Sequence, residues 1–207
     1  MNTMHIAADA RDAQAQALAM LQRGGLVALP TDTVYGVAAL ISQPEAIERL
    51  YAVKGRQHTK AIAVLLGAAE QLDRVAQQPS AAAHRLAARF WPGALTLVVP
   101  RRPELPANLS PSDTVGVRVP AHALTQQLLL ASGPLAVTSA NRSGEPDALD
   151  AAAVLAQLGG GIELLLDGGR TPGAVPSTVV DTTLSPPQIL RAGPIGAAQI
   201  LAALQAE

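Results

Sequence analysis

The chain has 207 residues, of which 49% are hydrophobic and only 15% are charged. This length suits one domain with a substantial core, and the composition excludes a disordered chain. The formal net charge of −1 lacks the overall basic character that is typical of nucleic-acid-binding domains. The chain has no cysteine, which excludes disulfides, thiolate metal sites and a cysteine nucleophile.

Metal sites and membrane segments are also not expected. The four histidines, His5, His58, His84 and His122, do not have the spacing of a zinc site, so we expect no metal centre built from protein ligands. The N-terminus has no apolar signal region, and apolar runs such as 61–66 are too short to cross a membrane. These features favour a cytoplasmic location.

Hydrophobic periodicity and turn residues predict an alternation of helices and strands. Ser42 and Glu45 have the spacing of a capping box at the start of the second helix. The predicted helices are 9–23, 44–53, 121–131, 148–158 and 195–204, with two short helices within 67–90 on either side of 78–80. The predicted strands are 26–30, 62–66, 95–99, 115–119, 135–138, 162–166, 178–182 and 188–190.

Several of these strands follow one another directly, which predicts an α/β fold with a mixed sheet. No internal repeat and no linker divides the chain, so we expect a single domain over 1–207. Residues 101–113 are the most loop-like internal segment. They are either a mobile flap over a site or a surface connection.

Polar residues cluster just after predicted strands, where α/β sheets usually place ligands. The first cluster runs from Pro30 to Gly36 and contains Thr31, Asp32 and Thr33. These side chains either cap a following helix or hydrogen-bond a small polar ligand.

A second cluster is cationic and lies at the end of the predicted helix 44–53. It comprises Lys54, Gly55 and Arg56, with Lys60 close behind. Cations at a helix C-terminus are common and stabilising. The same residues could instead clamp phosphates, because Arg offers a bidentate fork and Lys a mobile point charge.

The third cluster, at 138–144, is either an ordinary turn or a site of close backbone approach to phosphate or ribose.

Arg118 lies within an apolar strand, and if it points inward it needs a carboxylate or phosphate partner. Ser177 and Arg191 are weak signals by themselves. Trp91 is best explained as a core anchor. Neither usual nucleotide-binding glycine fingerprint is present.

Taken together, these clusters resemble the YrdC/Sua5 family, the threonylcarbamoyl-AMP synthases. Seven sequences carry the resemblance, in the order that the family has: PTDTVYG at 30–36, KGR at 54–56, WPGALT at 91–96, VRVP at 117–120, TSANRSG at 138–144, STVVD at 177–181 and LRAG at 190–193. They extend over nearly the whole chain. The length is similar to that of the short, single-domain form of the family.

The resemblance implies a twisted mixed sheet flanked by helices, with an open, concave, basic cleft. It implies that L-threonine, bicarbonate and ATP, with Mg²⁺, give threonylcarbamoyl-AMP and pyrophosphate. A partner complex would then transfer the threonylcarbamoyl group to adenosine 37 of tRNAs that read codons beginning with A. Direct RNA binding is expected to be weak or absent.

The resemblance also implies roles for individual residues. Catalytic roles fall to Lys54, Arg56, Ser139 and Asn141. Threonine contacts fall to Thr33, Arg118, Thr138 and Ser177. ATP contacts fall to Arg56, Lys60, Thr114, Ser139, Ala140 and Arg191. In many relatives a histidine near the threonine follows the KxR motif, whereas this chain has Leu65 or Leu66 near that position.

Two alternatives compete with this interpretation. A non-catalytic module that binds double-stranded RNA would suit a concave basic cleft, but the net charge and the scarcity of aromatic residues disfavour it. A relative that uses carbamoyl phosphate would resemble enzymes with much longer chains and zinc-finger segments, which need cysteines.

Overall fold

In the computed structural model, which describes residues 2–173 and 175–205, ten strands form a single sheet. The strands are β1 (Met4–Ala7), β2 (Val27–Leu29), β3 (Gly36–Leu40), β4 (Ala63–Leu65), β5 (Leu95–Pro100), β6 (Thr114–Arg118), β7 (Leu135–Ser139), β8 (Leu164–Asp167), β9 (Thr178–Asp181) and β10 (Gln188–Arg191). Their order in the sheet is β1-β8-β2-β3-β7-β4-β6-β5-β9-β10.

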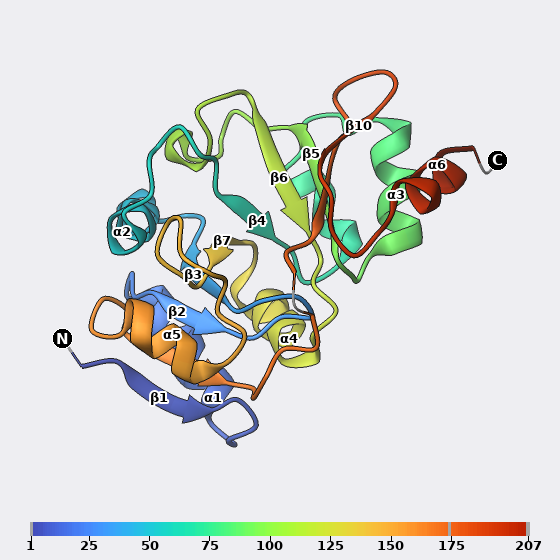
Figure 1. Cartoon of the computed structure of the whole chain (residues 1–207). Helices are drawn as coiled ribbons and strands as arrows, with labels where there is room; N and C mark the ends of the chain where they lie inside the picture. The colour runs from blue at the N-terminus through green and yellow to red at the C-terminus, as the bar shows by residue number, and fades with distance from the viewer. Residues whose placement is uncertain (1, 174, 206–207) are drawn as a thin grey trace.

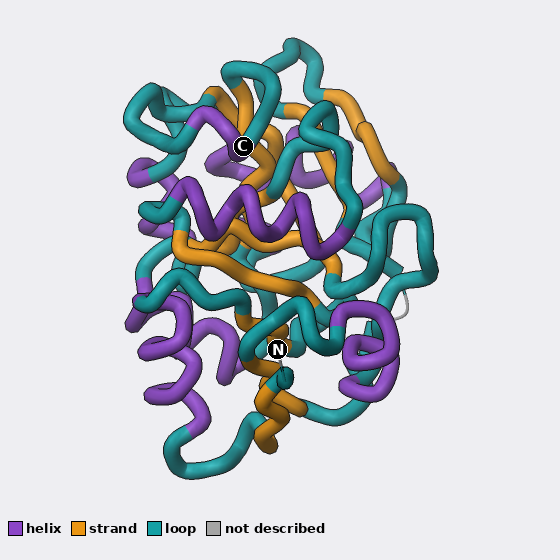
Figure 2. The backbone as a smooth tube through the Cα atoms, turned by 90° about the vertical axis from the view of Figure 1, so that its left-hand side faces the viewer, coloured by secondary structure: helices purple, strands orange, loops and turns teal. Residues whose placement is uncertain are grey.

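Six α-helices and two 3₁₀ helices complete the described part of the chain. They are α1 (Ala13–Gln22), α2 (Pro44–Lys54), η1 (Ala69–Arg74), α3 (Ala81–Phe90), η2 (Ala107–Leu109), α4 (Ala123–Ser132), α5 (Ala151–Leu158) and α6 (Ala197–Gln205). Figure 2 shows helices to either side of the strands. The sheet contains parallel pairs such as β4–β6 and β5–β9 as well as antiparallel pairs such as β3–β7 and β5–β6. The predicted α/β fold with a mixed sheet is confirmed.

Helices cover the two faces of the sheet unequally. Because side chains alternate between faces along a strand, each strand contributes to two separate sets of neighbours. The larger apolar cluster joins one sheet face to α2, α3, α5 and α6. The smaller cluster joins the other face to α1 and α4, and within it the sheet residues come from β2, β3, β4, β7 and β8 (Figure 1).

The second face is therefore left uncovered over β5, β6 and β9. Val115 and Val117 of β6 pack into the larger core, whereas Gly116 and Arg118 point the other way and line a cavity. The same alternation in β5 places Leu97 in the core and leaves its neighbours facing the cavity. The place where the covering helices stop is thus the place where a ligand can reach the sheet.

Several predicted boundaries differ from the structure. Strands β1 and β3 were not predicted, and β3 shows that the cluster 30–36 precedes a strand instead of capping a helix. The predicted capping box at Ser42 is wrong, because α2 begins after Gln43 and has no side-chain cap. Helix α5 begins later than residue 148, since the carboxylate of Asp150 accepts a hydrogen bond from the Ala153 amide and caps it.

Residues 101–113 pack against the body of the protein. The side chain of Leu109 is fully buried, and its carbonyl accepts a hydrogen bond from the Ile62 amide at 2.7 Å. The Asn108 carbonyl accepts one from the Tyr51 hydroxyl at 3.0 Å. No residue of this segment lines the cavity, so the structure favours the surface connection.

Trp91 is the core anchor that its position in the sequence indicated. Its side chain is buried in the larger cluster, and its indole N–H donates to the Leu95 carbonyl at 2.7 Å. None of the helices in the described ranges combines the length and apolar character needed to span a bilayer.

Candidate active site

The uncovered face of the sheet forms the floor of a cavity of about 450 Å³. Strands and loops far apart in the sequence meet here, and three arginines reach it from different elements. The residues that line it are Thr31, Thr33, Val34, Tyr35, Gly36, Arg56, Ala61, Ile62, Ala63, Leu65, Thr96, Val98, Gly116, Arg118, Val137, Thr138, Ser139, Asp147, Pro176, Ser177, Val179 and Arg191.

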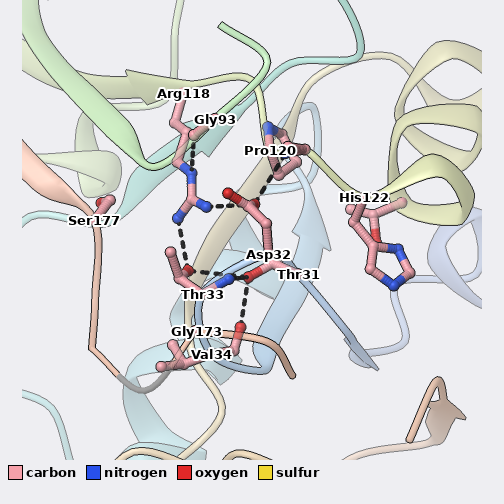
Figure 3. A network of polar contacts seen from close by, with 12 residues as sticks. Thr31, Asp32, Thr33, Val34, Gly93, Arg118, Pro120, His122, Gly173 and Ser177 are labelled. Atoms are coloured by element: carbon pink, nitrogen blue, oxygen red, sulfur yellow. Dashed lines mark hydrogen bonds and ion pairs between the residues drawn. The ribbon is translucent and has the colours of Figure 1, made fainter. Parts of the chain in front are cut away.

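Arg118, at the end of β6, is buried and held from three sides (Figure 3). Its Nε donates to the Gly93 carbonyl at 2.9 Å, its Nη1 to the Thr33 hydroxyl at 2.9 Å and its Nη2 to the Asp32 carboxylate at 2.5 Å. Asp32 also accepts a hydrogen bond from the Ala121 amide at 2.9 Å. Two of the five guanidinium N–H groups remain without a partner within the described ranges.

This network keeps a buried positive charge at the cavity wall. Burial lowers the pKa of Arg118, and the neighbouring Asp32 carboxylate opposes that effect. The loop that carries Asp32 is itself braced, because the Thr31 hydroxyl donates to the Val34 carbonyl at 2.7 Å and accepts from the Thr33 amide at 3.1 Å (Figure 3). A carboxylate ligand would find a preorganised cationic partner here.

Across the cavity lie Ser177, which directly precedes β9, and Arg191, the last residue of β10. The Ser177 hydroxyl lies 2.7 Å from the Thr96 hydroxyl of β5. Arg191 donates to the Ser177 carbonyl at 3.0 Å through Nε and to its hydroxyl at 3.2 Å through Nη2. These contacts fix the Arg191 guanidinium beside the polar groups of the floor.

Lys54 lies behind the cavity wall. It is the last residue of α2, and Gly55 follows in the left-handed conformation at φ 60°, which turns the chain. The Lys54 ammonium donates to the Ser139 carbonyl and to both the carbonyl and the side-chain oxygen of Asn141. All three N–H groups of Lys54 thus hold the segment that follows β7.

The burial of Lys54 affects its ionisation. Its pKa is lowered to about 8, first by burial and then by the Arg56 charge, while the Asp147 charge opposes both effects. Ser139 and Asn141 are also linked directly, because the Ser139 hydroxyl donates to the Asn141 side-chain oxygen at 2.5 Å. The structure therefore joins Lys54, Ser139 and Asn141 in one polar cluster, of which Ser139 faces the cavity.

Arg56 reaches the cavity from the turn after α2. Its Nε donates to the Lys60 carbonyl at 3.1 Å and its Nη2 to the Ala61 carbonyl at 2.7 Å. Burial lowers the pKa of its guanidinium. The two carbonyl contacts give this otherwise flexible side chain a defined orientation at the rim.

The structure brings most of the predicted site residues together, but not all. Lining positions are occupied by Thr33, Arg56, Arg118, Thr138, Ser139, Ser177 and Arg191. Lys60 is exposed and Thr114 is half-buried, and neither lines the cavity. Ala140 is buried, and its amide already donates to the Tyr35 carbonyl at 2.8 Å.

Several cavity residues received no role from the sequence. Asp32 was noted only as part of its cluster, and its pairing with Arg118 depends on a contact 86 positions away. Thr96 is the last residue of the 91–96 sequence but was given no role, and Asp147 lies just beyond the polar cluster at 138–144. Leu65 lines the wall, whereas Leu66 is fully buried in the core, so Leu65 is the residue at the place where relatives were expected to carry a histidine.

The arrangement can bind a ligand with two kinds of anionic group. Arg118, with Thr33 beside it, suits a carboxylate on a small polar molecule. Arg56 and Arg191 suit phosphate oxygens, since guanidinium groups bind them bidentately. No set of three or more side chains suited to ligating a metal occurs in the described ranges, so the cavity offers charge and hydrogen bonds instead of a preformed metal centre.

Comparisons with known proteins agree with this geometry. A family model for the Sua5, YciO and YrdC proteins, described as "Telomere recombination", matches residues 19–193. A Mycobacterium leprae relative is 41% identical over 187 residues, which cover 90% of this chain and 85% of the relative. The threonylcarbamoyl-AMP synthase of Pyrococcus abyssi is 41% identical over 86% of this chain, and that of Bacillus subtilis is 38% identical over 92% of it. Both relatives are longer, so the matched region is only 53% of the first and 56% of the second.

Solved structures give the same result. The P. abyssi Sua5 structure in complex with L-threonine matches with a TM-score of 0.94 at 36% identity, over 99% of this chain and 61% of that one. Escherichia coli YciO matches with a TM-score of 0.84 at 26% identity, over 96% and 97% of the two chains. The chain is therefore a member of the Sua5/YciO/YrdC family.

Proposed function

We propose that this chain is a threonylcarbamoyl-AMP synthase, which converts L-threonine, bicarbonate and ATP to threonylcarbamoyl-AMP and pyrophosphate. The observation that carries the proposal is the convergence of Arg56, Arg118 and Arg191 on one cavity. The names of the relatives and the threonine complex of the P. abyssi protein support it.

The threonine subsite would lie around Arg118. The two remaining N–H groups of its guanidinium would bind the threonine carboxylate, which places the amine toward the middle of the cavity. Thr33, Thr138 and Ser177 would complete the subsite through their hydroxyl groups. Leu65 would present an apolar surface to the substrate at the place where relatives were expected to offer a histidine.

The triphosphate subsite would lie between Arg56 and Arg191, with Ser139 close by. Lys54 and Asn141 would act by positioning Ser139, because the structure commits the Lys54 ammonium to that segment. Thr114 lies on the same side of β6 as Arg118 by strand alternation, so it remains a proposed nucleotide contact at the rim, with Lys60.

Ala140 would be limited to a contact through its carbonyl or methyl group, because its amide is engaged.

The reaction needs no covalent nucleophile from the protein. The neutral amine of threonine adds to CO₂ derived from bicarbonate, a N–C bond forms, and loss of a proton gives N-carboxythreonine. One carbamate oxygen then attacks the α-phosphorus of ATP, and the bond from that phosphorus to the bridging oxygen breaks as pyrophosphate leaves. The protein contributes positioning and stabilisation of the developing charge.

Mg²⁺ is part of the proposal, as a partner of the phosphates. When bound, it would neutralise charge on the triphosphate. The cavity fits such an ion only if the phosphates supply most of its ligands, since no cluster of three metal-ligating side chains occurs in the described ranges.

The product would pass to a threonylcarbamoyl-transferring complex that modifies adenosine 37 of tRNAs reading ANN codons, in the cytoplasm. Direct RNA binding by this chain is proposed to be weak or absent. The competing function, a non-catalytic module for double-stranded RNA, would require affinity for RNA that falls steeply with salt.

The test is a product assay in which each substrate is omitted in turn. We expect pyrophosphate release only when threonine, bicarbonate and ATP are all present. With ¹³C-bicarbonate, mass spectrometry should detect an adenylate that carries threonine and the labelled carbon.

Variants connect the activity to the cavity. Arg56→Ala should lower turnover by about 10²–10³, the usual cost of one lost charge-assisted contact in the transition state. Arg85→Ala, at an exposed position of α3, is the matched control and should retain turnover. Pyrophosphate release that does not depend on threonine, or salt-dependent RNA binding without any release, would reject the proposal.

A further inference from the structure

One side chain in the cavity wall has a charge opposite to its neighbours. Asp147 lies in the loop between β7 and α5, beside a residue whose carbonyl accepts a hydrogen bond from the Tyr35 amide at 2.9 Å. Asp147 lines the cavity, and within ranges 2–173 and 175–205 its carboxylate makes no hydrogen bond or ion pair. Asp32, by contrast, accepts hydrogen bonds from Arg118 and from the Ala121 amide, both at Oδ1.

The loop that carries Asp147 is tied to the Lys54 side of the cavity, because the Ser143 amide donates to the Lys54 carbonyl at 2.8 Å. The electrostatic effects of Asp147 agree with this position. Burial lowers the pKa values of Lys54 and Arg191, and in both cases the Asp147 charge opposes the effect. The charges that act on Arg118 are those of Asp32 and Arg191. Asp147 is therefore close to the Lys54 and Arg191 side, where the proposed function puts the triphosphate.

A carboxylate facing a triphosphate would repel it, unless a cation lies between them. Mg²⁺ is the ion that suits such a place, because it prefers oxygen ligands and is commonly bound by one or two carboxylates together with substrate phosphates and water. Lys54 and Arg191 do not remove the repulsion by contact, since neither forms an ion pair with Asp147 in this structure.

We propose that Asp147 is a ligand, direct or through one water, of the divalent cation that enters the cavity with the nucleotide's phosphates. This inference rests on nucleotide binding in the proposed function, but it does not depend on threonine or bicarbonate chemistry. It assigns one protein oxygen to an ion whose other ligands come from phosphate and water.

The test measures equilibrium binding, so it does not depend on turnover. Isothermal titration gives the dissociation constants of a nonhydrolysable ATP analogue and of inorganic tripolyphosphate, each with saturating Mg²⁺ and with EDTA. The proteins are the wild type, Asp147→Asn, Asp147→Ser and the control Glu145→Gln, an exposed acid of the same loop. Threonine affinity, measured in parallel, reports whether each variant retains the cavity.

For each protein, the effect of Mg²⁺ is the ratio of the dissociation constant with EDTA to that with Mg²⁺. We expect this ratio, for both ligands, to be at least about tenfold larger in the wild type and Glu145→Gln than in the two Asp147 variants. About tenfold is the lower limit for loss of a group that supports a metal. With EDTA, the Asp147 variants should bind tripolyphosphate as tightly as the wild type or more tightly, because a like charge has been removed.

Two results would overturn the inference. One is an equal effect of Mg²⁺ in all four proteins. The other is a loss confined to the ATP analogue, with tripolyphosphate unaffected, which would assign Asp147 to the ribose hydroxyls. Neither result depends on whether pyrophosphate is released in the product assay, so the inference and the proposed function can fail separately.

Discussion

Arg118 and Asp32 illustrate how single residues prepare the cavity. The Arg118 side chain is only 7% exposed, and Asp32 at 15% exposure is its one acidic partner within the described ranges. Removing one member of a buried pair leaves the other charge uncompensated, which typically costs about 3–5 kcal/mol.

Asp32→Ala should therefore lower the free energy of unfolding by about 3 kcal/mol and raise the KM for threonine, because Arg118 loses the contact that orients it. Urea unfolding and initial-rate kinetics measure the two effects. Asp113→Ala, at an exposed site, should change neither by a significant amount. A wild-type threonine KM in Asp32→Ala would show that Arg118 does not need Asp32 to bind substrate.

The buried ammonium group of Lys54 should make the free energy of unfolding depend on pH. Its pKa in the folded protein is about 8, below the ordinary value of 10.5, because its charge is buried. Between these two pH values the unfolded chain binds the proton more than the folded chain does. The contribution of Lys54 to stability is therefore lowest below pH 8 and rises as the pH increases toward 10.5.

The measurement compares the wild type with Lys54→Met, which cannot titrate at this position. The free energy of unfolding of the wild type should increase relative to that of the variant between pH 7.5 and pH 9.5. A difference that stays constant over this range would mean that the ammonium is not affected by its burial.

The polar residues of the candidate site stand out in an apolar chain, but by themselves they left a structural alternative open. Lys54 with its glycine, the arginine inside a valine-rich strand and the polar segment after β7 received their roles from the family resemblance. Asp32 and Asp147 could not be assigned, since their significance depends on which strands are neighbours. The engagement of Lys54 with the carbonyl groups of Ser139 and Asn141 was likewise invisible before the fold was known.

At the scale of elements, α3 and α2 begin in different ways, and only the start of α2 was predicted to have a capping side chain. Ser80 caps α3, and its hydroxyl accepts a hydrogen bond from the Ala83 amide at 3.2 Å. Ser42 has the same residue type and a suitable glutamate, but α2 begins after Gln43, with Pro44 as its first residue. Proline at that position has no amide to satisfy, and the amide of Ala46, the third helical residue, donates to the Gln43 carbonyl at 3.0 Å instead of to a capping side chain.

Ser80→Ala should lower the free energy of unfolding by about 1 kcal/mol, the usual cost of losing a helix cap. Ser42→Ala is the matched change at an exposed serine without that role, and it should stay within about 0.5 kcal/mol of the wild type. Thermal or urea unfolding measures the free energy of unfolding of both variants. Equal losses would mean that the Ser80 hydrogen bond does not stabilise α3.

Strand prediction failed where local patterns carry little information. β1 is a four-residue edge strand with mostly exposed side chains, so it has no apolar alternation to detect. β3 is buried on both faces, and the polar residues just before it suggested a loop or helix start. The order of strands was not predictable, because pairs such as β3–β7 join segments about a hundred residues apart and their register is set by packing.

At the scale of the molecule, one sheet serves both as the frame of the core and as the floor of the cavity. Because the larger apolar cluster includes residues from β2 through α6, we expect residues 1–207 to behave as one domain. Unfolding should be a single transition, with coincident curves from circular dichroism and from the fluorescence of the buried Trp91. Separate midpoints would indicate two units.

The same architecture explains why the site is composed of residues from so many segments. Helices α1 and α4 cover the sheet over β8, β2, β3 and β7 and end before β6 and β5 (Figure 1). On the face left open, every second side chain of the remaining strands lines the cavity, together with residues of the loops after α2 and β7. A cavity made this way can hold two substrates next to each other, which is what the proposed reaction requires.

The most direct test of this account is a crystal structure of the protein with L-threonine and a nonhydrolysable ATP analogue. We predict that both ligands occupy the one cavity, with the threonine carboxylate on Arg118 and the phosphates between Arg56 and Arg191. Ligands bound at separate places, or a nucleotide that does not touch either of these two arginines, would contradict it.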